Sequence, residues 1–292
     1  MLVSALAFSV MSALVKLAGS RLESVEIAIF RGVITLVASW ITLRRLRLSP
    51  WGQRTRWLLF RGMLGFGGLH CYFYAVTALP LAEATVIHFL NPILTALAAA
   101  VFLREPLRRT DLMGTALGFS GVILVARPSF LFGDARPLDP FALGIAVLGA
   151  CFGATAYIVI RKLRETEHPA VVVFHFPLLT VPLTLPLLLP TPWWDAPFEW
   201  LWPTPFEWAV LLALGIATQI GQVKLTEGLH LEPAARATAV SYAQVVFALV
   251  WGALLFGETP TPTTLAGAAL VALGTIVVAR PRREPPVTQS QH

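Results

Sequence analysis

Long runs of apolar residues, separated by short polar stretches, follow one another along the whole chain. Each run is close to the roughly 20 residues that an α-helix needs to cross a lipid bilayer. The pattern therefore predicts ten membrane-spanning helices, at residues 2–18, 25–43, 58–77, 81–103, 109–126, 138–160, 170–189, 206–229, 234–256 and 263–279. The first span begins at Met1 without a basic leader or a small-residue cleavage site, so we expect a retained helix rather than a signal peptide.

The composition agrees with a protein that is embedded in lipid. Hydrophobic residues make up 56% of the chain and charged residues only 13%, a balance that excludes an ordinary soluble domain. The sequence has no H-E-x-x-H motif, no cysteine pair at metal-binding spacing, no Walker loop and no G-x-S-x-G motif. We therefore expect an all-α integral membrane protein that is not an enzyme and carries no metal or other cofactor.

The basic residues divide unequally between the two sets of loops. The even-numbered loops and the C-terminal tail carry fifteen of them, against four near the odd-numbered loops. Because basic residues concentrate on the cytoplasmic side of a membrane, both termini are expected in the cytoplasm, with the protein in the cell (inner) membrane. The fifteen are Arg44, Arg45, Arg47, Arg54, Arg56, Arg104, Arg108, Arg109, Arg161, Lys162, Arg164, Arg236, Arg280, Arg282 and Arg283.

Residues 102–128 recur, in altered form, at residues 255–281. An offset of 153 aligns the two stretches without a gap, with 12 of 27 positions identical, including Glu105 and Glu258. Each half then holds five predicted spans, so the second half must enter the membrane upside down relative to the first. The charges change accordingly, since the cytoplasmic residues Arg104, Arg108 and Arg109 correspond to the uncharged residues Gly257, Thr261 and Pro262.

The repeat gives the predicted organisation. It consists of a five-helix repeat at 1–128, an outer connecting loop at 129–137, an inverted five-helix repeat at 138–281 and a disordered cytoplasmic tail at 282–292. Inverted repeats are the architecture of many secondary carriers, whose halves rock about a site near the bilayer midplane. Gene duplication also builds channels and membrane enzymes, so a passive facilitator, or an enzyme that uses His70, His88 or His175, stays open as an alternative.

Polar residues at mid-span are the candidates for a substrate site, because polar groups that face lipid are costly. His88, Asn91 and Thr95 lie on one face of the fourth predicted helix, and the offset carries the first two onto Ser241 and Gln244. A shared central cavity and simple hydrogen bonding between helices are both compatible with this pattern. Pro92 predicts a kink beside the site in the first half only, because the second half has Val245 there.

Further candidates lie in the second, third and eighth predicted helices. They are His70 and Tyr74, spaced i, i+4, Gln219 and Gln222, one turn apart, and Arg31. A guanidinium can scarcely be neutralised, so Arg31 needs a partner inside the membrane. The alternatives are a structural pair with an acidic residue or a clamp on a substrate carboxylate. Among the acidic residues, Glu83 starts from the same outer side as Arg31, whereas Glu26, five residues away, lies off its helical face.

Three stretches carry a resemblance to a known family. They are EIAIFRG in the second span, LPLAEATVIHFLNPILTALAAAVFLREPL through the fourth, and the Glu-x(8)-Gly-x(6)-Gly block that occurs twice and ends at Gly121 and Gly274. The chain resembles the EamA-type permeases of the drug/metabolite transporter superfamily over essentially its whole length. The resemblance implies ten helices and a central cavity, and it implies that the last helix of each half is scaffold and, in some relatives, a dimer contact.

The resemblance also implies a function. Similar proteins move amino acids, nucleosides, S-adenosylmethionine, riboflavin or amphipathic drugs, so we expect an alternating-access carrier of a small polar or amphipathic metabolite, working as an exporter. The expected partners are this small molecule, the lipid bilayer and a second copy in a homodimer, with no nucleic acid. Glu105 and Glu258 match an acidic position of the family at helix–loop junctions, where we expect capping or loop ordering rather than substrate contact.

Overall fold

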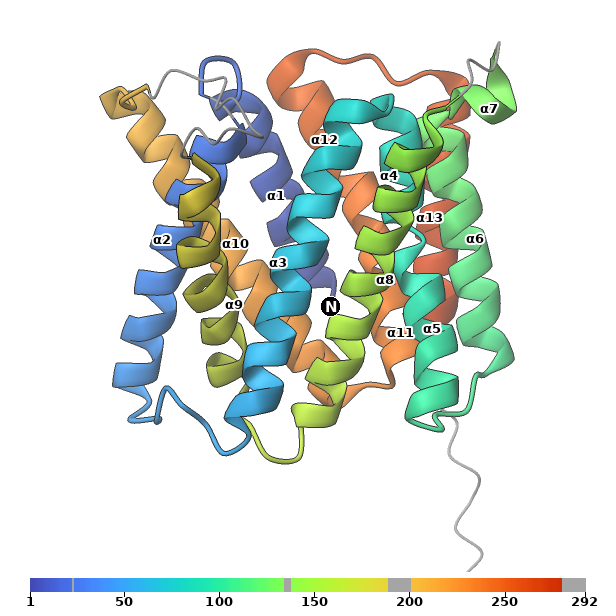
Figure 1. Cartoon of the computed structure of the whole chain (residues 1–292). Helices are drawn as coiled ribbons and strands as arrows, with labels where there is room; N and C mark the ends of the chain where they lie inside the picture. Colours follow the sequence, from blue (N-terminus) through green and yellow to red (C-terminus); the bar gives the residue numbers. More distant parts are fainter. Residues whose placement is uncertain (23, 134–137, 189–200, 280–292) are drawn as a thin grey trace, which may run out of the picture.

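The computed structural model describes residues 1–22, 24–133, 138–188 and 201–279, and within these ranges it contains helices and no β-strand (Figure 1). The expected tail at 282–292 and part of the connecting loop at 129–137 lie outside them. The helices in chain order are α1 (Leu2–Ala18), α2 (Ser24–Arg45), α3 (Thr55–Ala78), α4 (Leu81–His88), α5 (Asn91–Phe102), α6 (Arg109–Ala126), α7 (Ser129–Phe132), α8 (Pro140–Leu163), α9 (Pro169–Thr184), η1 (Leu185–Leu188), α10 (Pro205–Leu231), α11 (Ala234–Ala239), η2 (Val240–Tyr242), α12 (Ala243–Phe256) and α13 (Pro262–Ala279).

The lengths and compositions of these helices confirm a multi-pass membrane protein. Six helical stretches are long and apolar enough to cross a bilayer, namely Glu26–Arg45, Glu83–Phe102, Pro140–Leu163, Pro205–Leu231, Ala234–Phe256 and Pro262–Ala279. The helices α1 and α9 are apolar but shorter. The other four predicted spans coincide with α1, α3, α6 and α9, and as membrane spans they stay predictions.

Two of the predicted spans are broken near their middle. In the first half, α4 ends at His88 and α5 begins at Asn91, with Pro92 in the first turn of α5, where its missing N–H does no harm. In the second half, α11 passes through the 3₁₀ turn η2 into α12. Regular α-helix is therefore interrupted in both halves, although only the first half has a proline at this position. The second break needs no proline, because the Ser241 hydroxyl donates to the Thr238 carbonyl (2.6 Å), a bond that competes with regular helical geometry.

The two breaks contact each other. The Tyr242 hydroxyl donates to the carbonyl oxygen of Phe89 (3.1 Å), and the two rings lie 5.8 Å apart. An offset of 153 separates these two residues, so each is the repeat equivalent of the other. The breaks are thus joined at the same position of both repeats.

Helices that are distant in sequence pack against one another. α1 packs against α10 and α12, α3 packs against α8 and α9, and α2 packs against α9 and α10. α5 also packs against α8 and α11. The core is therefore built from interleaved helices, with early and late parts of the chain in contact along its length.

The helices α6 and α13 form the most intimate pair, and glycines let them approach closely. A Cβ added at Gly121 would lie 2.5 Å from the Gly267 carbonyl oxygen, and one added at Gly267 would lie 2.7 Å from the Gly121 oxygen. Gly114 and Gly274 face each other in the same reciprocal way, at 2.8 and 2.7 Å. With the offset of 153, Gly267 is equivalent to Gly114 and Gly274 is equivalent to Gly121. Gly121 therefore meets the equivalent of Gly114, and Gly114 meets the equivalent of Gly121.

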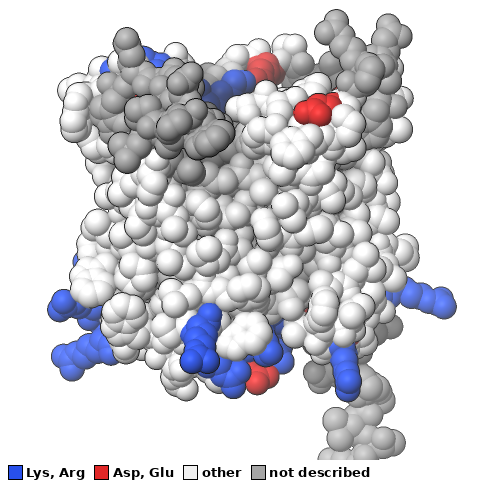
Figure 2. Space-filling model, in the orientation of Figure 1, with Lys and Arg blue, Asp and Glu red and all other residues white. Residues whose placement is uncertain are grey.

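The charged side chains gather at the ends of the helices. Figure 2 shows lysine and arginine concentrated at the lower end, with a broad uncharged band above it. The connections 46–54, 103–108 and 164–168 lie at that end (Figure 1). We call it the basic end, and the other the opposite end.

Candidate functional site

A small cavity lies where the two helix breaks meet. It encloses about 50 Å³ and is lined by Ser4, Ala5, Phe8, His88, Phe89, Asn91, Pro92, Tyr157, Leu225, Ser241 and Gln244. Both breaks contribute to it, and α1, α8 and α10 complete its wall. A volume of this size holds one or two water molecules, whereas pockets for small metabolites measure roughly 300 Å³ or more. A metabolite would therefore fit only after the helices move apart.

Four of the predicted site residues meet in this cavity. His88 and Asn91 come from the first break, and Ser241 and Gln244 come from the second. The His88 side chain stays exposed although its ring lies 4.6 Å from that of Tyr72. Together the four side chains offer hydrogen-bond donors and acceptors without a permanent charge.

Thr95 supports this group without lining the cavity. It is fully buried, and its hydroxyl donates to the Asn91 side-chain oxygen (3.1 Å). This bond uses only the oxygen of the Asn91 amide, so its two N–H donors remain for other partners. The predicted one-face pattern of the fourth helix thus yields two cavity residues, His88 and Asn91, and one residue, Thr95, that orients Asn91.

The remaining candidates lie outside the cavity. The His70 ring bonds the Phe66 carbonyl oxygen (3.0 Å), Gln219 accepts from the Ser39 hydroxyl of α2 (3.0 Å), and Gln222 accepts from Arg61 (3.4 Å). Tyr74 packs edge-on against Phe141, with ring centroids 6.1 Å apart. Gln219 therefore serves the contact between α10 and α2.

Arg31 is not paired with either acidic residue that the sequence suggested. Glu26 accepts the backbone N–H of Leu201 (2.6 Å), and Glu83 accepts both the N–H (2.7 Å) and the hydroxyl of Ser129. Within the described residues Arg31 has no ion pair, and its side chain is half-buried. Both carboxylates instead hold loops in place.

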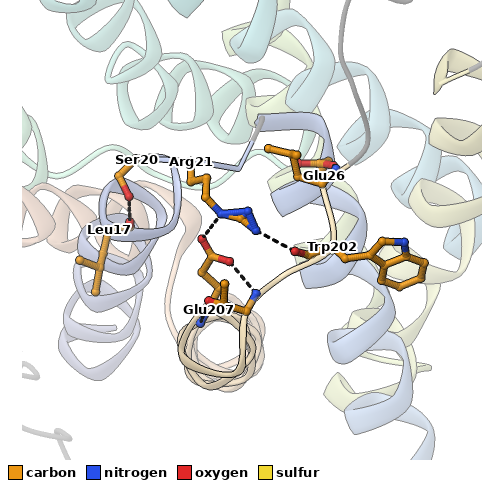
Figure 3. A network of polar contacts seen from close by, with 8 residues as sticks. Leu17, Ser20, Arg21, Glu26, Trp202 and Glu207 are labelled. Carbon is orange, nitrogen blue, oxygen red and sulfur yellow. Dashed lines mark hydrogen bonds and ion pairs between the residues drawn. The ribbon is translucent and has the colours of Figure 1, made fainter.

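An ionic network ties loops together at the opposite end. The Arg21 guanidinium bonds the Glu207 carboxylate (2.9 Å) and the Trp202 carbonyl (2.8 Å), as Figure 3 shows. The other oxygen of Glu207 accepts the N–H of Thr204 (2.7 Å), which completes a capping box at the start of α10. These groups are structural, since each one is engaged by the protein itself.

The two repeated glutamates form equivalent motifs. The N–H of Glu105 bonds the Ala99 carbonyl (3.2 Å) and that of Glu258 bonds the Gly252 carbonyl (3.1 Å), so each bond reaches back six residues to the end of the preceding helix. The residue before each glutamate is left-handed, with φ 54° at Arg104 and 64° at Gly257. The expected ordering of the loop therefore includes a specific helix ending that both repeats share.

Each glutamate also forms an ion pair with the first helix of the other half. At the basic end, the Glu105 carboxylate bonds Arg161 Nε (2.6 Å) and the Ala234 N–H (2.8 Å), while Arg161 Nη1 donates to the carbonyls of Leu229 and His230. At the opposite end, Glu258 pairs with Lys16. Arg161 and Lys16 are each two residues from the end of their helix, α8 and α1.

Sequence reasoning missed three further polar residues. Tyr157 and Ser4 line the cavity, and Arg61 is buried and donates to Gln222. Arg61 had a detectable signal, because it is a charged residue within the span predicted at 58–77. Ser4 and Tyr157 had none, since single hydroxyl groups are common in membrane helices.

A comparison with known protein families identifies the family to which the chain belongs. The model of the EamA-like transporter family matches residues 1–127 and 140–280. The chain belongs to the EamA-like transporter family. The resemblance seen in the sequence is thereby confirmed, and the two matched segments follow one another along nearly the whole chain.

Relatives in this family are named as transporters. The chain is 31% identical to the pseudopaline exporter CntI of Pseudomonas aeruginosa over 94% of this chain and 93% of that protein. It is 27% identical to an S-adenosylmethionine uptake transporter of Rickettsia conorii over 90% of this chain and 85% of that one. The protein is thus a membrane transporter, in a family whose named members here are not enzymes.

A solved crystal structure shares the fold. It superposes with a TM-score of 0.78 over 95% of this chain and 96% of the other, at 21% sequence identity. At this level of identity the match concerns the arrangement of helices alone.

Proposed function

We propose that the protein is a secondary transporter that moves a small polar or amphipathic metabolite by alternating access, and that it works as an exporter. The observation that carries this proposal is the cavity between the two helix breaks. Four of its polar residues come in equivalent pairs from the two repeats, namely His88 with Ser241 and Asn91 with Gln244. Broken helices that meet at a shared site are the usual construction of secondary transporters.

Two inverted five-helix repeats, at 1–128 and 138–281, are part of this proposal. It is supported by the reciprocal glycine contacts of α6 and α13, the Tyr242–Phe89 bond and the two matching helix endings before Glu105 and Glu258. The Tyr242–Phe89 bond joins two residues that are equivalent in the repeats. In the glycine contacts, each glycine meets the equivalent of the other glycine on its own helix. The two helix endings recur with an offset of 153 residues. Contacts of this kind are expected when two similar halves are related by a pseudo-two-fold axis.

The basic end is proposed to face the cytoplasm of a cell in whose inner membrane the protein lies. The loops 46–54, 103–108 and 164–168, together with the adjoining helix ends, carry ten of the 19 arginines and favour this orientation. Both termini would then be cytoplasmic, with a second copy as a possible partner in the membrane.

Alternating access requires that the two ends close in turn, and the ends differ in how firmly they are closed. At the basic end α5 packs against α11, while their repeat equivalents α12 and α4 lack comparable packing at the opposite end. We propose that the Glu105–Arg161 cluster is the closed gate at the basic end and that Glu258–Lys16 forms the corresponding gate in the other state.

The direction of transport is proposed from one relative. CntI is named an exporter, and it matches this chain over more of its length than the Rickettsia relative, which is named an uptake transporter. The first substrates to test are amino acids, nucleosides and S-adenosylmethionine, which are among the substrate classes that the family resemblance implies.

Counterflow in proteoliposomes tests the proposal. Vesicles loaded with unlabelled amino acids, nucleosides or S-adenosylmethionine should accumulate the labelled compound transiently and with saturation if the protein is a carrier. Uptake that neither saturates nor responds to substrate inside the vesicle would indicate a passive channel. Turnover of a test compound into a new product would indicate an enzyme.

Variants of the cavity sharpen the test. Asn91→Ala and Gln244→Ala should lower counterflow about tenfold or more, because each removes a polar contact at the shared site. Gln219→Ala is the matched control, since Gln219 bonds Ser39 outside the cavity. Normal counterflow in both cavity variants, with all three proteins folded, would contradict the assignment of the site.

A further inference from the structure

Arg61 is a charged side chain that the protein buries without giving it a counter-ion. The residue is 3% exposed, and its Nε and Nη1 atoms are buried without a hydrogen-bond partner. Its Nη2 atom donates to Gln222 over 3.4 Å, which is long for a hydrogen bond. Within the described residues no carboxylate lies at ion-pair distance from it.

The surroundings of Arg61 hold the guanidinium in place without neutralising it. The group lies over the Phe176 ring, 4.8 Å from its centroid, and Gly65 on the next turn leaves room for Nη1. The ionisable side chains that interact with it are Tyr157 and His175, neither of which is a carboxylate. An arginine near a helix end usually extends toward water, but this one is turned inward.

Two residues, Tyr157 and Gln222, connect the guanidinium with the cavity wall. Tyr157 lines that cavity and also interacts electrostatically with Arg61. Gln222, which accepts the weak bond from Arg61, lies one turn before Leu225, another residue of the cavity wall. Widening the cavity between α8 and α10 would therefore bring its contents to the free N–H groups of Arg61.

We propose that Arg61 is an anion subsite of the transport pathway and that the transported molecule carries an oxyanion, either a carboxylate or a phosphate. This inference rests on the proposed transport function and names the substrate class within it. An arginine keeps its charge at any physiological pH, and carboxylates and phosphates match its planar donor set. The neutral residues at the helix breaks would bind the rest of the molecule, and Arg61 would bind its negative group.

The wild-type protein provides the first test. Matched pairs of compounds that differ in charge are compared in counterflow and in thermal shift of the detergent-purified protein. Suitable pairs are an amino acid with its carboxamide, and a nucleoside 5′-monophosphate with its nucleoside. We expect only the member of a pair that carries the carboxylate or phosphate group to be transported and to stabilise the protein. The pair that responds distinguishes carboxylate from phosphate.

Variants locate the subsite. Arg61→Gln should weaken the apparent affinity for the anionic compound about 30-fold or more and abolish the preference over its neutral partner. Arg61→Lys keeps the charge but not the planar fork, so an intermediate loss with retained preference is expected. Arg56→Gln, an exposed arginine on the same helix, is the control and should behave as wild type.

The outcomes separate this inference from the proposed function. Saturable counterflow of neutral compounds with no anion preference would overturn the anion subsite and leave the carrier intact. Absence of saturable counterflow with every compound, in a folded wild-type protein, would overturn both. If Arg61→Gln does not fold, the charge preference of the wild type and the result with Arg61→Lys still decide the matter.

Discussion

The Glu105 cluster at the basic end and the Glu258 pair at the opposite end have the same origin in sequence but different surroundings. Both glutamates follow the same helix ending and reach the first helix of the other half. The side chains of Glu105 and Arg161 are only 15% and 8% exposed, whereas those of Glu258 and Lys16 are 53% and 55% exposed. Arg161 also binds two backbone carbonyls, while Lys16 lies over the Phe256 ring (4.3 Å).

This difference in burial decides how much each pair stabilises its end. Removing one partner of a buried pair costs about 3–5 kcal/mol, because the other charge stays desolvated, whereas exposed pairs contribute about 0–1 kcal/mol. The basic end is therefore the firmly closed one in this conformation. Equivalent residues can thus differ several-fold in energetic importance, depending on which end of the molecule is packed.

The largest expected effect concerns the sidedness of the two repeats. With Cys71 and Cys151 replaced, single cysteines are introduced as Arg108→Cys and Thr261→Cys, at equivalent and exposed positions. In intact cells a membrane-impermeant maleimide should label position 261 and reach position 108 only after permeabilisation. Labelling of both positions from the same side would refute the inverted arrangement.

Breaking the buried cluster should have the next largest effect. Arg161→Leu leaves the Glu105 carboxylate buried without its partner, so the free energy of unfolding should fall by about 3–5 kcal/mol. Thermal unfolding in detergent measures this loss. Arg164→Leu, whose side chain is exposed next to Glu165, is the control and should change stability by about 0.5 kcal/mol or less. Equal effects of the two substitutions would mean that the cluster does not close the basic end.

Substituting the two left-handed residues, Arg104 and Gly257, should change the free energy of unfolding by a smaller amount and differently in the two repeats. Gly257→Ala places a Cβ at a positive φ and should cost about 1 kcal/mol, whereas Arg104→Gly relieves the same strain and should not destabilise the protein. Both variants are compared with wild type by thermal unfolding. A destabilising Arg104→Gly would show that the Arg104 side chain contributes more than its backbone strain costs.

Disrupting the exposed pair should have the smallest effect. Lys16→Leu should lower the free energy of unfolding by about 1 kcal/mol or less, with the difference from wild type shrinking in high salt. A loss as large as that of Arg161→Leu would show that the opposite end is also firmly held, and the contrast between the two gates would then not stand.

The sequence predicted the helical class, the family and the meeting of His88, Asn91, Ser241 and Gln244, because repeats and mid-span polar residues leave a pattern along the chain. It did not predict the second helix break, which depends on a hydroxyl bonding within its own turn rather than on a proline. The partners of Glu105 and of Arg61 were also out of reach, since they come from helices distant in sequence. Burial, which separates the Glu105 cluster from the Glu258 pair, is a property of tertiary packing that no local pattern reports.

The reciprocal glycine contacts between α6 and α13 have a consequence for the origin of the chain. In each contact a glycine meets the counterpart of its neighbour, so the contact surface of α6 is complementary to the equivalent surface of α13. A single ancestral five-helix unit with these glycines could have paired with an identical unit inserted in the reverse direction. Joining two such genes would then have preserved an existing interface instead of requiring a new one.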